Sequence, residues 1–133
     1  RDLVRSRGLG DVYKRQVIMV PKERVELFLR QFHQKMKVFR IIFRDDRGKN
    51  IRTLAELEIT PAFRESVVGS LTVADYSEGP FVDALYGLGE IWVFGKVIKN
   101  REVYIKICLG RENSQTICIS FHLAEYRMKY PFK

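Results

Sequence analysis

The sequence predicts an α+β fold, in which a helical layer packs on a small antiparallel sheet that ends in a three-stranded meander. The hydrophobic periods carry this prediction. Apolar residues recur every three or four positions in the first half of the chain and every two positions in the last third. The composition is typical of one globular core, since 46% of the 133 residues are hydrophobic and 30% are charged. We therefore expect a single domain.

The first half contains three predicted helices and one short strand. Between Pro21 and Met36 the apolar residues lie on one helical face, and Val38 to Phe43 is a short run of strand-forming residues that ends at a turn. A second, short helix is predicted over Ile51 to Leu57. Thr60 stands directly before a proline, which is a typical helix start, and the apolar residues extend this third helix to Leu71.

Strands fill the second half after an irregular connection. Thr72 to Gly89 is predicted as a loop, because Gly79-Pro80 breaks any regular element and further glycines follow. Alternating apolar residues then predict strands over Ile91–Phe94, Glu102–Leu109 and Thr116–His122. With short turns between them, these strands make an antiparallel meander.

Alternation along the meander predicts which side chains share a face. Because successive strand residues point to opposite faces, burying the odd-numbered apolar residues against the helices turns a second set outward. This set comprises Tyr104, Lys106, Cys108, Thr116, Cys118, Ser120 and His122. The sequence therefore predicts one surface that holds a tyrosine, a lysine and a histidine.

Tyr104, Lys106 and His122 have the chemistry for RNA cleavage without a metal. Attack of a ribose 2′-OH on the adjacent phosphorus requires a base, a positive group beside the phosphate and an acid for the departing 5′-oxygen. Histidine titrates near neutrality, lysine stabilises phosphate, and tyrosine can donate or orient a proton. The alternative is a solvated sheet face without a catalytic role, because such faces commonly carry these residue types. Alternation leaves both hypotheses open.

The net charge of +8 is distributed unevenly. Residues 1–16 carry five basic and two acidic side chains without apolar periodicity, and they resemble a translated adapter or vector segment. We therefore expect the domain to span residues 17–133. Residues 17–95 carry eleven charges of each sign, whereas residues 96–133 carry eight basic and three acidic side chains. The basic excess of the last third predicts salt-sensitive binding to RNA.

Several classes of protein are disfavoured by what the sequence contains. No apolar run approaches the roughly 18–20 residues of a membrane span, so we expect a soluble protein without membrane contact. Cys108 and Cys118 form neither a disulfide framework nor a closed zinc site, and they favour a reducing, cytoplasmic location. The neighbouring Asp45 and Asp46 are typical of a turn rather than of a metal site. We expect neither a metal nor another cofactor.

Short segments of the chain occur in the order and approximate spacing of a known family. They are Ala74-Asp75-Tyr76 after a helix, Ile91-Trp92, Val103-Tyr104-Ile105-Lys106-Ile107 and Ile119-Ser120-Phe121-His122. Over Leu57 to His122, about half of the chain, this order resembles the MqsR family of toxins from bacterial type II toxin–antitoxin systems. Each segment is short, so the resemblance depends on their shared order.

The resemblance implies a RelE-like ribonuclease fold, cleavage of mRNA that inhibits translation, and a cognate antitoxin, expected to contain a helix-turn-helix. It implies functional roles for Tyr104 and Lys106 and places His122 where the family has a functional lysine. Ser77 and Val93 depart from the family, which has a lysine and a glutamine at these places. The departures leave an alternative open, namely a non-catalytic RNA- or protein-binding module with the same fold.

Four further basic residues are predicted to bind RNA. Lys96 and Lys99 lie on the meander and are candidates to supply the positive charge that Ser77 lacks. Arg127 and Lys129 belong to the tail after the last strand, where basic residues are interleaved with aromatic ones, a composition that suits phosphate contact and base stacking. Packing of this tail against the sheet explains the same composition equally well.

Overall fold

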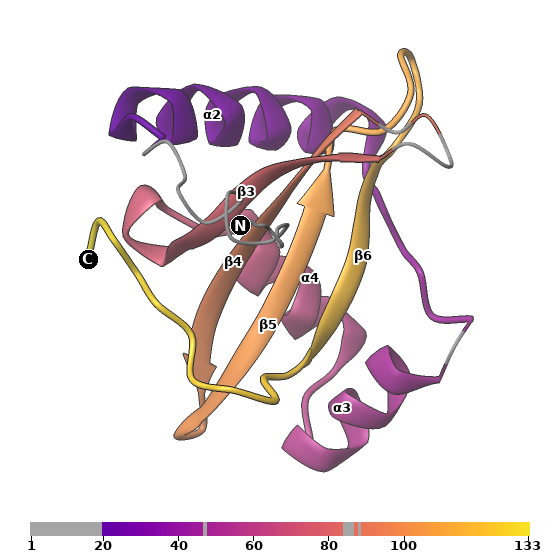
Figure 1. The fold of residues 1–133 in the computed structure, drawn as a ribbon. Coiled ribbons are helices and arrows are strands. Elements are labelled where there is room, and N and C mark those ends of the chain that lie inside the picture. Colours follow the sequence, from indigo (N-terminus) through magenta and orange to yellow (C-terminus); the bar gives the residue numbers. More distant parts are fainter. Residues whose placement is uncertain (1–19, 47, 84–86, 88) are drawn as a thin grey trace, which may run out of the picture.

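The computed structural model describes residues 20–46, 48–83, 87 and 89–133 (Figure 1). Within these residues the chain forms three α-helices and a five-stranded mixed sheet, which is an α+β arrangement. The predicted adapter segment, residues 1–16, lies outside the described residues. No helix in the described ranges has both the length and the apolar character needed to cross a membrane.

Apart from one short strand, the helices come first along the chain and the strands follow, and all five strands belong to one sheet. The helices are α2 (Lys22–Phe39), α3 (Lys49–Leu57) and α4 (Pro61–Gly69), followed by the short 3₁₀ helix η1 (Val73–Asp75). The strands are β2 (Ile41–Phe43), β3 (Tyr76–Asp83), β4 (Gly89–Ile98), β5 (Arg101–Cys108) and β6 (Thr116–Leu123). They are arranged in the order β2-β6-β5-β4-β3.

The predicted meander is confirmed, but the sheet is not wholly antiparallel. β4, β5 and β6 pair antiparallel, and β3 extends them as a fourth antiparallel strand. β2 instead pairs parallel to β6, with Ile41 opposite Thr116. Parallel partners need a long connection, and here α3, α4 and three strands intervene between β2 and β6. The expectation of a purely antiparallel sheet is therefore wrong at this edge.

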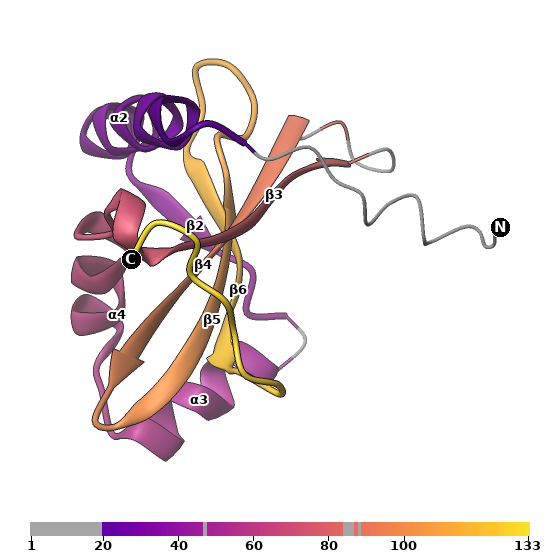
Figure 2. The ribbon, with the colours of Figure 1, turned by 60° about the vertical axis from the view of Figure 1, so that its left-hand side comes forward.

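The core lies between one face of the sheet and the helices, and Figure 2 shows α2 and α4 on the same side of the strands. Phe28 of α2 stacks on Trp92 of β4 with ring centroids 4.9 Å apart. The predicted start of α4 is confirmed, because the Thr60 hydroxyl accepts a hydrogen bond from the Phe63 backbone N–H at 3.0 Å. As its period predicts, α2 buries one apolar row, Val25, Phe28, Leu29 and Phe32.

Several boundaries differ from the sequence prediction, among them the end of α2, and the strand β3 was not predicted. α2 continues through the exposed Val38 to Phe39, so the first strand begins only at Ile41. The predicted loop over residues 72–83 is wrong, because β3 occupies Tyr76 to Asp83 despite Gly79-Pro80. A proline is tolerated there since β3 is an edge strand, and its pairing with β4 shifts register on both sides of Glu78.

A β-bulge in β6 changes the phase of the strand. Ser120 pairs with Lys106 and Cys118 pairs with Ile107, which leaves Ile119 as an extra residue between them. Cys118 therefore joins the buried core, together with Thr116, which is also fully buried. The prediction that Cys118 and Thr116 share the polar face is wrong, because a bulge reverses the alternation on one side of it.

Candidate active site

β5 and β6 bring Tyr104, Lys106 and His122 together on the sheet face that α2 and α4 leave uncovered. Tyr104 and His122 are direct cross-strand partners. Their rings stack with centroids 5.2 Å apart and an interplanar angle of 14°. The Lys106 Nζ lies 5.9 Å from the centroid of the Tyr104 ring. The three side chains are half-buried and form one cluster.

The cluster lines a cleft of about 900 Å³. The walls come from separate parts of the chain: the loop after β2, the start of α3, the strands β3, β4, β5 and β6, and the tail after β6. Five basic side chains line the cleft, against three acidic ones. The basic side chains are Arg44, Lys49, Lys106, Arg127 and Lys129, and the acidic ones are Asp46, Glu78 and Glu125.

The backbone defines which nitrogen of His122 is available for chemistry. The His122 Nδ1 lies 3.0 Å from the carbonyl oxygen of Leu123. A carbonyl only accepts hydrogen bonds, so Nδ1 carries the hydrogen and donates it. In the neutral imidazole Nε2 is therefore the nitrogen with a free electron pair. This arrangement gives a base whose tautomer and ring position are both fixed.

Tyr104 is held in its neutral form. Burial raises the pKa of the Tyr104 phenol above its usual value, and the negative charge of Glu78 raises the pKa further. The phenol therefore keeps its proton at neutral pH. It can donate a hydrogen bond to a phosphate oxygen, and it is still a stronger acid than the alcohol that RNA cleavage releases.

Two of the four predicted RNA-binding residues lie at the cleft. Arg127 and Lys129 line it from the tail, and no ion pair joins Lys106, Arg127 or Lys129 to an acidic side chain of the described residues. Their charges are thus not neutralised within the cleft and are suited to an anionic ligand.

Lys96 and Lys99 lie away from the cleft. Lys96 stands opposite the buried Val103, on the helix side of the sheet, and its Nζ forms an ion pair with Asp75 at 3.0 Å. Lys99 is in the turn after β4, where its Nζ donates to the carbonyl of Glu58 at 3.2 Å. The hypothesis that these lysines supply the charge missing at Ser77 has no geometric support, because strand alternation and the turn direct both away from the cluster.

The tail after β6 is packed against the cleft face of the sheet. The carboxylate of Glu102 accepts hydrogen bonds from the backbone N–H of Met128 at 3.1 Å and from the Tyr130 hydroxyl at 2.7 Å. Gly95 makes room for this contact, since a Cβ there would collide with the Tyr130 hydroxyl and lie 2.8 Å from the Met128 sulfur. The packing of the tail against the sheet is therefore confirmed, and its role in binding RNA stays a prediction.

Several residues that line the cleft could not be predicted from the sequence. Lys49 forms an ion pair with Glu125 at 2.7 Å, and this partner lowers the pKa of the Glu125 carboxyl. Arg44 lies 3.6 Å from Asp46. These residues follow β2, begin α3 and follow β6, so no spacing in the sequence brings them together. Ser77 lines the cleft, as does Glu78 beside it.

No family model, curated protein or solved structure matches this chain. Within the described ranges, no three histidine, cysteine, aspartate or glutamate side chains are grouped so that they could hold a metal ion. The chemistry available to the described cleft side chains is that of a fixed imidazole, a protonated phenol and several cationic groups.

Proposed function

We propose that this protein is the toxin of a type II toxin–antitoxin system, a metal-independent mRNA endoribonuclease with a RelE-like fold that inhibits translation. The observation that carries the proposal is the stacking of His122 on Tyr104 beside Lys106 in a basic cleft. A helical layer on one sheet face and a cleft on the other supports the RelE-like arrangement, and the resemblance to the MqsR family supports the toxin role.

The proposed reaction is an internal transfer at phosphorus. His122 Nε2 takes the proton of a ribose 2′-OH, whose oxygen attacks the adjacent phosphorus. The Lys106 ammonium stabilises the negative charge that develops on the phosphate oxygens. The bond from phosphorus to the 5′-oxygen breaks, and the Tyr104 hydroxyl donates a proton to that oxygen. The products are a 2′,3′-cyclic phosphate and a 5′-hydroxyl end.

The basic side chains of the tail would bind the RNA on either side of the scissile bond. Arg127 and Lys129 line the same cleft as the three reacting residues, and Tyr126, which is 84% exposed, offers a ring on which an unpaired base can stack. This division of roles places phosphate binding on the tail and bond cleavage on the strands.

A matched pair of RNA substrates tests the proposal. The purified protein is incubated with 5′-labelled mRNA in EDTA, and in parallel with the same RNA carrying a 2′-deoxyribose at the cleaved position. We expect EDTA-resistant cleavage with a 2′,3′-cyclic phosphate end, and no cleavage at the deoxy position. Intact RNA that still binds the protein would favour the alternative, a non-catalytic binding module, and intact RNA without binding would contradict both.

The proposed partner is a cognate antitoxin containing a helix-turn-helix, and the proposed location is the cytoplasm. Both follow from the resemblance to the MqsR family. Growth arrest on expression of this chain in bacteria, relieved by co-expression of a small protein encoded beside it, is the expected result. Growth that is unaffected by expression of a folded chain would contradict the toxin role.

A further inference from the structure

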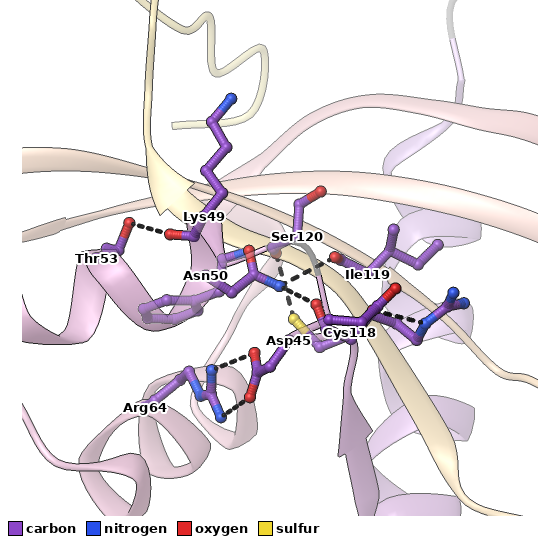
Figure 3. A network of polar contacts seen from close by, with 11 residues as sticks. Asp45, Lys49, Asn50, Thr53, Arg64, Cys118, Ile119 and Ser120 are labelled. Carbon is purple, nitrogen blue, oxygen red and sulfur yellow. Dashed lines mark hydrogen bonds and ion pairs between the residues drawn. The ribbon is translucent and has the colours of Figure 1, made fainter.

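A buried amide forms part of the wall of the candidate active site. Asn50, in the first turn of α3, is only 5% exposed, and its side chain makes three hydrogen bonds that leave its own helix (Figure 3). Its Nδ2 donates to the carbonyl of Arg44 at 2.7 Å and to the carbonyl of Ile119 at 3.2 Å. Its Oδ1 accepts from the backbone N–H of Phe121 at 2.9 Å. Only an amide supplies two donors and an acceptor in this arrangement.

Two of these hydrogen bonds are made to the backbone of the β6 bulge, at Ile119 and at Phe121. Ile119 and Phe121 flank Ser120, and Ile119 is the residue that the pairing with β5 leaves over. A bulge interrupts the regular ladder of backbone hydrogen bonds, so the backbone groups beside it need other partners. Asn50 supplies those partners from a different element of the fold.

The bulge determines on which face of the sheet the His122 side chain lies. With the bulge, Phe121 stands opposite Ile105 and His122 opposite Tyr104. If β6 continued from Cys118 without the extra residue, His122 would stand opposite Val103, whose side chain is in the core on the other face of the sheet. The stacking of the imidazole on the phenol therefore depends on one inserted residue.

A partly buried ion pair holds the segment that Asn50 contacts. The Arg64 guanidinium, which is 4% exposed, donates two hydrogen bonds to the carboxylate of Asp45 at 3.0 and 3.1 Å. The same guanidinium lies 3.7 Å from the ring centroid of Phe43 in β2. Asp45 follows the residue whose carbonyl Asn50 binds, so α4 fixes the entry to α3 and with it the position of the amide.

We propose that Asn50 is a positioning residue for His122: its amide clamps the β6 bulge at Ile119 and Phe121 and thereby holds the imidazole against Tyr104. The kinetic consequence of this inference rests on the proposed ribonuclease function. The clamp itself is a property of the fold and can be measured without any activity.

The test compares Asn50→Ala with Thr53→Val. Thr53 is the matched control, since it is also buried on α3 but its hydroxyl bonds only the Lys49 carbonyl of its own helix, at 3.1 Å. RNA cleavage is measured at a temperature where both variants are folded. We expect kcat to fall about 100-fold in Asn50→Ala, with KM changed less than about threefold, because a small displacement of a reacting group has this effect on rate. Thr53→Val should retain the wild-type kcat.

Nuclear magnetic resonance supplies a second readout. Ring-to-ring cross-peaks between Tyr104 and His122 should be present in the wild type and in Thr53→Val, and lost in Asn50→Ala. Retention of both the cross-peaks and kcat in Asn50→Ala would overturn the proposal. If Asn50→Ala does not fold, hydrogen exchange of the wild type decides instead: the Phe121 amide should be strongly protected, and rapid exchange there would overturn the clamp.

The two proposals fail in different ways. If the wild type does not cleave RNA, the proposed function is wrong, and the cross-peaks alone decide whether Asn50 positions His122. If the wild type cleaves RNA and Asn50→Ala keeps kcat and the ring contact, the function stands and the positioning role is wrong.

Discussion

The two faces of the sheet are built from the same strands, but their side chains serve different purposes. On the helix-covered face, the side chains of Trp92, Phe94, Ile105 and Phe121 are almost completely buried. On the cleft face, the same strands present half-buried polar groups that interact by cross-strand pairing. The first face requires apolar volume, whereas the second requires a particular register. A change of volume should therefore damage stability, and a change of register should damage function.

The largest effect is expected on the helix-covered face. Phe94→Ala should lower the free energy of unfolding by about 3–5 kcal/mol, because Phe94 is fully buried and its removal leaves a cavity. Val97→Ala is the control, since Val97 lies on the same strand but is 60% exposed, and it should cost less than about 0.5 kcal/mol. Urea denaturation of both variants measures the difference. Similar decreases in the free energy of unfolding of the two variants would contradict the distinction between the two faces.

A smaller effect is expected where the tail meets the cleft face. Gly95→Ala should displace the tail, because the added Cβ collides with Tyr130. The disturbed contact between Tyr130 and Glu102 should lower the free energy of unfolding by about 1–2 kcal/mol. Gly69→Ala at the end of α4 is the control, since a Cβ there meets only Met36 at an ordinary 3.8 Å. Thermal unfolding checks both. A crystal structure of Gly95→Ala with an unmoved tail would contradict the explanation.

Basic residues at the cleft should contribute more to RNA affinity than basic residues outside it. Arg127→Ala and Lys129→Ala together should weaken RNA binding by about tenfold and reduce the slope of log K against log salt by about 2, since each removes one phosphate contact. Lys96→Ala and Lys99→Ala together remove the same formal charge from outside the cleft. That control should change the affinity much less. Equal losses in the two double variants would indicate a diffuse effect of net charge.

The smallest effect is an alkaline loss of stability. Burial raises the pKa of Tyr76, Tyr104 and Tyr130 in the folded protein, and for Tyr130 the carboxylate of Glu102 adds to this. The unfolded chain then releases these protons at lower pH than the folded chain does. The stabilisation is complete below the unfolded tyrosine pKa of about 10 and is lost as pH rises through the folded values. Tyr130→Phe should flatten the decline measured by urea denaturation above pH 10, and an unchanged slope would argue against the buried phenol.

The helix-covered face could be predicted from sequence, because its signal is periodic and local. The apolar row of α2, the cap at Thr60 and the alternation of Val103, Ile105 and Ile107 are repeated patterns within one element, and each is confirmed. β3 was not predicted, because it contains Gly79-Pro80. A proline is tolerated in a strand at the edge of a sheet, and which strand forms the edge is a property of the assembled sheet.

The cleft face could be predicted only in part. Tyr104, Lys106 and His122 share it as alternation predicts, whereas Cys118 does not. The difference comes from one extra residue in β6, and the amide that stabilises it, Asn50, lies about 70 positions earlier in the chain. No local pattern connects a helix residue to a distant bulge. The cleft wall formed by α3 could not be predicted for the same reason, whereas the composition of the tail did single out Arg127 and Lys129, which line the cleft.

The most direct test of the central claim is the pH dependence of RNA cleavage by the wild type and by His122→Ala. Imidazole is the side chain that changes charge between pH 5 and 8, and a base acts only when it is unprotonated. The wild-type rate should therefore rise across this range, and His122→Ala should be about 10²–10⁴-fold slower and lack the rise. His122→Ala that keeps the wild-type rate and the wild-type pH profile would contradict the account.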